Sequence, residues 1–241
     1  MNDGGNNNKP TGLNVAYESF DPLTGVFDQD TFFKIARMLI DGKSDGYYVF
    51  SFLNIDNFKI INDRFGIGVG DAVLKYVASV IKDFADAAGG ICGRLFADNF
   101  ALLYPHNCVE SKEMNDAHER IHHPDVLSQP IRLRTGRYFV ENKDDSVMTM
   151  FDRARIAANF VRNSYDKEIS VFDKDMLDYL IRRQLIVEDM NTALASGEFK
   201  LFFQPQYNHA TGAIMGAEVL VRWLKNGEYV LPGKFISVFE E

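Results

Sequence analysis

Cysteine and long apolar runs are both scarce in this 241-residue sequence. Cys92 and Cys108 are the only cysteines, and neither stands in a C-x-x-C or Cys/His ligand spacing, so we expect reduced thiols. The longest apolar runs, such as YYVFSFL, fall far short of the roughly 18 residues that a membrane-spanning helix needs. The sequence therefore predicts no membrane segment, and a cytoplasmic location is the default expectation.

Positive charge is scarce as well. The sequence holds 26 Lys and Arg against 34 Asp and Glu, a net charge of -8. Nucleic-acid binding requires a basic face that displaces counterions from phosphates, so no nucleic-acid partner is expected. Residues 1–20 lack the basic start and apolar core of a secretory signal, and their polar composition predicts a disordered leader.

Potential zinc ligands occur in two stretches. PHNC contains His106 and Cys108, and RIHHP contains His122 and His123. No spacing among these four residues supports a tetrahedral site. We therefore expect a solvated loop and a helix end at these positions.

Apolar periodicity and turn residues predict an alternation of helices and strands. Helical patterns cover residues 28–42, 70–90, 109–123 and 146–163, and strand patterns cover 46–56, 93–105, 131–140 and 169–172. This order predicts an α/β (α+β) sandwich, with a mixed central sheet and helices mainly on one side. A long helix is expected over residues 173–196, followed by strands over 199–207 and 212–223.

The stretch GRLFADNFALLYP, residues 93–105, reads as two short strands folded about residues 96–99. Tight hairpins favour glycine or Asn-Gly at the tip, because the primed turns need positive φ. Phe-Ala is an unusual tip. The turn is either an ordinary hairpin with unfavourable residues at its tip or a former catalytic turn that has lost its catalytic groups.

Two stretches carry a resemblance to known families. FLNIDNFKIINDRFGIGVGDAVL, followed by RLFADNFALL, resembles the signature region of the GGDEF family, the bacterial diguanylate cyclases that join two GTP molecules into cyclic di-GMP. Gln204-Pro205 and GAEVLVRW resemble the opening of the EAL family, phosphodiesterases that hydrolyse cyclic di-GMP. After the leader (1–20), the resemblance implies a degenerate GGDEF domain (21–173), a joining helix (174–196) and the first strands of an incomplete, TIM-like EAL barrel (197–241).

The resemblance also indicates which catalytic groups are missing. Phosphoryl transfer needs carboxylates that hold Mg²⁺ ions on the phosphates. The family's strand-end aspartate corresponds to Asn54, and its name motif corresponds to Phe96, Ala97, Asp98, Asn99 and Phe100. Asp98 is left as a weak metal-ligand candidate, Phe96 would fill the space of the triphosphate, and the family's late Lys and Arg align approximately with Asn159 and Asn163. The resemblance thus implies a fragment that is not an enzyme and holds no metal tightly.

Two interpretations of the purine-binding end stay open. Asn62, Asp71, Phe58 and Lys59 match family positions around the guanine base, and Asp71 offers an acceptor to guanine N1–H and N2–H₂. Alternatively, Asp71 is an N-cap after Gly70 and Asn62 holds a turn. The first interpretation makes GTP an effector, and the second makes the domain a scaffold.

In the EAL segment, the resemblance implies that Glu218 is a ligand of the Mg²⁺ or Mn²⁺ of a full-length domain, and that Gln204 and Arg222 contact cyclic di-GMP. The alternative is that Glu218 is a solvent-facing strand residue. The resulting hypothesis is a catalytically silent GGDEF domain that modulates an attached EAL phosphodiesterase. Its alternatives are a nucleotide-independent module that forms a homodimer or docks a partner, and an active cyclase with an unusual turn.

Overall fold

The computed structural model describes residues 18–122, 127, 130–161 and 168–239. The chain divides into two compact units, Met1–Asp173 and Lys174–Glu241, which are treated separately below. Residues 1–17 of the predicted leader lie outside the described residues. The prediction that the leader extends to residue 20 is wrong at its end, because Phe20 pairs with Phe27 in an antiparallel bridge. None of the described helices is both long and apolar enough to cross a membrane.

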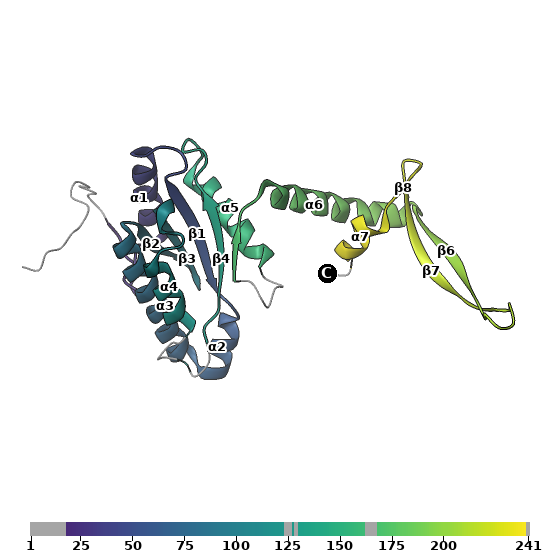
Figure 1. Ribbon diagram of the computed structural model, residues 1–241, viewed down its shortest axis with the longest axis horizontal. Helices are drawn as coiled ribbons and strands as arrows, with labels where there is room; N and C mark the ends of the chain where they lie inside the picture. Colours follow the sequence, from purple (N-terminus) through teal and green to yellow (C-terminus); the bar gives the residue numbers. More distant parts are fainter. Residues whose placement is uncertain (1–17, 123–126, 128–129, 162–167, 240–241) are drawn as a thin grey trace, which may run out of the picture. The chain divides into compact units, whose positions relative to one another are not determined.

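The first unit is built on a five-stranded mixed sheet in the order β2-β3-β1-β4-β5 (Figure 1). The strands are β1 (Tyr48–Ile55), β2 (Ile91–Phe96), β3 (Asn99–Pro105), β4 (Leu133–Phe139) and β5 (Ile169–Val171). β1 is antiparallel to both β3 and β4, and β5 joins β4 in parallel. The aromatic and β-branched run of β1 is buried on both faces, as expected for a central strand. The predicted mixed sheet is confirmed.

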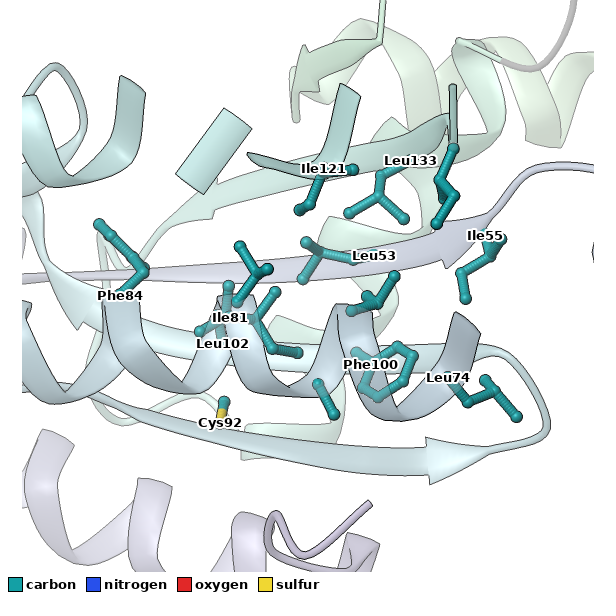
Figure 2. Close-up of a cluster of buried hydrophobic side chains, with 14 of the residues drawn as sticks. Leu53, Ile55, Leu74, Ile81, Phe84, Cys92, Phe100, Leu102, Ile121 and Leu133 are labelled. Carbon is teal, nitrogen blue, oxygen red and sulfur yellow. The ribbon is translucent and has the colours of Figure 1, made fainter. Parts of the chain in front are cut away.

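Helices cover both faces of this sheet. The buried side chains of α3 (Ile67–Ala88) and α4 (Lys112–His122) pack on one face, together with α2 (Phe58–Phe65), as Figure 2 shows for α3 and the strands beneath it. Those of α1 (Gln29–Asp41) and α5 (Val147–Phe160) pack on the other. The prediction that helices lie mainly on one side is wrong, because alternate residues of β1, such as Phe52 and Leu53, supply an apolar surface to each face.

Local sequence signals explain most helix boundaries. Asp28 caps α1 by accepting a hydrogen bond from the Thr31 amide at 2.8 Å, and Gly42 ends that helix as predicted. α2 was not predicted; Gly66, at φ 87°, separates it from α3. A short 3-10 turn, η1 (His106–Cys108), precedes α4.

The second unit contains α6 (Lys174–Ala195), the antiparallel sheet β6 (Phe199–Tyr207), β7 (Ile214–Lys225) and β8 (Glu228–Val230), and α7 (Pro232–Phe239). A helix is thus present where residues 173–196 predict one. Ala193, Trp223 and Phe235 form a small buried cluster, and the Trp223 indole donates to Glu198 at 2.8 Å.

Candidate functional site

The hairpin between β2 and β3 turns on two residues, since Phe96 pairs with Asn99 and only Ala97 and Asp98 lie between them. Ala97 has φ 49°, the left-handed region that a residue with a Cβ adopts at a cost. The positive φ that the sequence indicated is therefore present without the glycine that normally provides it. Phe96 is half-exposed at the turn, whereas Phe100 is fully buried in the core.

Arg94 supports this turn. Its guanidinium donates twice to the Ala97 carbonyl, at 2.8 and 2.7 Å, and also to both carboxylate oxygens of Asp21, at 3.1 and 3.2 Å. Asp21 is further bonded by the amide and hydroxyl of Thr24 at 2.8 and 2.6 Å. Burial opposes ionisation of Asp21, but the donors on Thr24 and Arg94 outweigh it and lower the pKa of the carboxyl.

Strand pairing brings the two predicted catalytic stations together. Asn54 on β1 lies opposite Asn99 on β3, and its amide donates to Asp98 Oδ2 at 2.8 Å and to Asn99 Oδ1 at 3.0 Å. Burial raises the pKa of Asp98, while hydrogen bonding and the charges of Arg134 and Arg94 oppose that rise. The cluster at the turn therefore contains two amides and one carboxyl whose ionisation is disfavoured.

Arg134 is a component of this cluster that sequence reasoning missed. It lies opposite Asn54 on β4, donates to Asn54 Oδ1, and forms an ion pair with Asp56 in which Nε and Oδ1 are 3.2 Å apart. Only the pairing of β1 with β4 places a guanidinium beside Asn54, so the local sequence around either residue carries no signal of it.

The predicted purine-binding residues come from α2 and α3, which meet at Gly66. The Asn62 side chain lies against Gly70, where an added Cβ would fall 1.8 Å from Asn62 Oδ1, and the Phe58 ring borders the same spot. Asn62 Oδ1 is buried and has no hydrogen-bond partner among the described residues. Lys59, by contrast, is exposed.

Two alternative assignments at this end are corrected by the helices. Asp71 is half-buried and lies inside α3, whose N-cap is Gly66, so the N-cap prediction is wrong. Asn62 lies within α2 rather than in a turn. Asn159 is exposed in the last turn of α5, and Asn163 lies outside the described residues.

In the second unit, the β6–β7 register places Gln204 opposite Glu218. Arg222 is on the same face as Glu218, because strand side chains alternate and the two residues are four positions apart. Gln204 and Glu218 are exposed, and Arg222 is half-buried beside Phe202 and Tyr229 in a shallow hollow. The three predicted EAL positions therefore share one face of the hairpin, and the exposure of Glu218 also agrees with a solvent-facing strand residue.

Among the described residues, the structure does not bring His106, Cys108 and His122 together as a group of metal ligands. His106 is exposed on η1, His122 ends α4 as predicted, and His123 lies outside the described residues. The structure instead groups His122 with His118 and Glu168. The i, i+4 spacing of the two histidines in HERIH is the sequence signal of this group.

Comparison with known proteins identifies the families to which the two units are similar. The family described as "Diguanylate cyclase, GGDEF domain" matches residues 18–164, and the EAL domain family matches residues 187–241. The chain belongs to the GGDEF family, and its GGDEF domain is followed by part of an EAL domain. Both domains are those of cyclic di-GMP signalling.

Several curated proteins are similar over most of this chain. An uncharacterized protein of Sinorhizobium fredii, y4lL, is 30% identical over 200 residues, which are 78% of this chain and 24% of that protein. The bifunctional diguanylate cyclase/cyclic di-GMP phosphodiesterase MucR of Pseudomonas aeruginosa is 25% identical over 227 residues, 85% of this chain and 32% of that protein. The chain thus spans about a quarter to a third of the length of these relatives.

Solved structures show the same fold. The Vibrio cholerae LapD S helix-GGDEF-EAL structure, bound to c-di-GMP, matches with a TM-score of 0.57 at 15% identity, over 92% of this chain and 53% of that one. The coiled coil and GGDEF domain of DgcB from Caulobacter crescentus, in complex with c-di-GMP, matches with a TM-score of 0.52 at 22% identity, over 63% of this chain and 84% of that one.

Proposed function

We propose that residues 21–173 are a catalytically silent GGDEF domain that modulates an attached EAL phosphodiesterase through the helix over residues 174–196. The observation that carries this proposal is the guanidinium of Arg134 beside Asn54, paired with Asp56. Division of the chain after Asp173 supports the domain boundary.

Magnesium requires hard oxygen ligands in near-octahedral geometry, and carboxylates supply most of the attraction. At the β2–β3 turn, Asn54 and Asn99 are neutral, burial disfavours the charged form of Asp98, and Asp56 is already paired with a cation. A divalent ion approaching this cluster would meet the positive charge of Arg134. These residues do not fit the metal ions of the family's reaction, so we derive no phosphoryl-transfer step here.

The purine-binding end is different, because one of its polar atoms has no hydrogen-bond partner among the described residues. Asn62 Oδ1 is a buried acceptor without a described donor, and Asp71 supplies a half-buried carboxylate on the adjoining helix. Two acceptors match the N1–H and N2–H₂ donors on the guanine edge. We therefore propose GTP as the effector, bound mainly through its base.

For the EAL segment, we propose that Glu218 supplies one ligand to the Mg²⁺ or Mn²⁺ of the complete domain, and that Gln204 and Arg222 contact cyclic di-GMP. The shared face of these side chains supports the assignment. A bound divalent ion would activate a water molecule and stabilise charge on the phosphodiester. The planar guanidinium of Arg222 is suited to a bidentate grip on phosphate.

Two assays test the proposal. The fragment should form no cyclic di-GMP from GTP and Mg²⁺ or Mn²⁺. Formation of cyclic di-GMP that is abolished by Asp98→Ala would overturn catalytic silence.

In a longer chain with a complete EAL domain, deletion of residues 21–173 should change the rate of cyclic di-GMP hydrolysis and remove the response of that rate to GTP. An unchanged rate and an unchanged GTP response would refute the regulatory role.

A second candidate function is a homodimerisation or partner-docking module that needs no nucleotide. It is favoured by apolar side chains exposed on α6, including Ile181, Leu185 and Leu194. This alternative predicts loss of assembly in sedimentation experiments when Leu185 is changed to Glu, with no dependence of assembly on GTP.

A further inference from the structure

A group of metal-ligating side chains lies apart from both candidate sites, where α4 approaches the residue that precedes β5. His118 and His122 are one helical turn apart on α4, with ring centroids separated by 4.4 Å. His122 Nε2 is 3.0 Å from Glu168 Oε2. Ligand atoms of all three residues lie within 4.8 Å of one another.

Both sides of this group are anchored by contacts of their own. On the α4 side, the Tyr76 hydroxyl of α3 donates to the Arg120 carbonyl at 2.9 Å, and the Arg120 guanidinium pairs with Asp83 at 2.8 Å. On the other side, the Glu168 carbonyl accepts from the Thr135 amide of β4 at 2.8 Å. The helix and the backbone of Glu168 are therefore held to the fold before any ion binds.

The Glu168 carboxylate presents one oxygen to the histidines. Its other oxygen, Oε1, is 3.3 Å from Arg132 Nε, which orients the group and leaves Oε2 directed at His122. The guanidinium also brings positive charge to the site and weakens its attraction for a cation. Binding of a metal would replace the hydrogen that His122 and Glu168 share.

We propose that His118, His122 and Glu168 form a zinc site. Imidazole nitrogen and carboxylate oxygen are ordinary ligands of Zn²⁺, and His-x-x-x-His on a helix presents two nitrogens on one face. Zinc bonds of about 2.0–2.1 Å place tetrahedral ligands roughly 3.3 Å apart, so the group must contract slightly. His118 is exposed and can make that adjustment by rotating its side chain.

An ion held by these residues links α4 to the edge of the sheet. Because it binds the folded domain and not the separated residues, it raises the thermal unfolding temperature by mass action. The site shares no residue with the β2–β3 turn or the α2–α3 junction, so zinc binding can be measured on protein without GTP.

Metal-stripped, tag-free protein of the full 241-residue chain should be titrated with ZnCl₂ by calorimetry, with unfolding temperature as a second readout. We expect one ion per chain and a rise in unfolding temperature. His118→Ala and Glu168→Gln should each lose at least an order of magnitude in affinity and most of the thermal shift. His209→Ala, which removes an exposed histidine of the other unit, should change neither.

Absence of zinc binding by the wild-type chain at millimolar metal would overturn this inference. So would binding that both His118→Ala and Glu168→Gln retain at full strength, since the ion would then be held elsewhere. Circular dichroism of each variant verifies that a loss of binding does not arise from unfolding.

Discussion

At the scale of single residues, Ala97 determines the backbone conformation of the β2–β3 turn, and Arg134 determines the charge beside it. The sequence predicted the tight turn and the unusual residues at its tip, and Ala97 indeed has φ 49°. Arg134 could not be predicted, because its contact with Asn54 joins residues 80 positions apart through strand register. The same limit applies to the contact of Arg94 with Asp21, which joins residues 73 positions apart.

The strain at Ala97 leads to a stability prediction. Replacement by glycine removes a left-handed penalty of about 1–2 kcal/mol and adds chain entropy to the unfolded state worth about 0.4–1 kcal/mol. We expect Ala97→Gly to leave stability unchanged or to raise it by up to about 1.6 kcal/mol, measured by urea denaturation. Ala72→Gly, inside α3, is the control and should destabilise by about 0.5–1 kcal/mol. Equal destabilisation by both changes would contradict a strained turn.

The Asp21–Arg94 contact predicts a pH dependence. The pKa of Asp21 is lowered in the folded protein, so the carboxylate contributes stability above its unfolded pKa, near 3.9, and that contribution is lost as pH falls through the folded value. Asp21→Asn should therefore destabilise at pH 7, and the difference from wild type should shrink in strongly acidic buffer. Thermal unfolding across pH measures this, with the exposed Asp63→Asn as control. A difference that is constant with pH would count against an ionic role for Asp21.

At the scale of helices and strands, hydrophobic periodicity predicted most of the first unit. The runs that become α1, β1, α3 and β3 have clear periods and clear stop residues, and they form as expected. Periodicity does not reveal α2, because FKIINDRF is too short to show a helical repeat, and its separation from α3 rests on the backbone of Gly66. Which face each helix covers was also unpredictable from periodicity, which identifies an apolar side but not its partner.

The α2–α3 junction gives a prediction at this scale. A Cβ at Gly70 would fall 1.8 Å from Asn62 Oδ1 and 3.3 Å from the Phe58 ring, so Gly70→Ala must displace the Asn62 side chain. We expect a loss of at least an order of magnitude in GTP affinity, and less stabilisation than glycine-to-alanine changes normally give in helices. Gly68→Ala is the matched control, since nothing lies within 4 Å of its added Cβ.

In this comparison, calorimetry reports GTP affinity and chemical denaturation reports stability. If Gly70→Ala and Gly68→Ala bind GTP equally, the position of Asn62 is irrelevant to nucleotide binding and the effector assignment at this junction fails.

At the scale of the whole molecule, the order of motifs was sufficient to predict a GGDEF domain followed by part of an EAL domain, and the family matches confirm it. Motifs identify a family, but whether a domain has kept its catalytic activity depends on which side chains occupy the site. Here the side chains that fill the turn are Asn54, Asn99 and Arg134, and those that line the α2–α3 junction leave a buried acceptor unused. This contrast is the basis of the proposal that base recognition persists where phosphoryl transfer does not.

The most direct test of that proposal is a calorimetric titration of the 241-residue chain with GTP, with and without Mg²⁺, beside the Asn62→Ala variant. The account predicts micromolar binding that changes little when Mg²⁺ is omitted and is lost in Asn62→Ala. No binding at millimolar GTP, or binding that requires Mg²⁺ and is indifferent to Asn62, would contradict it.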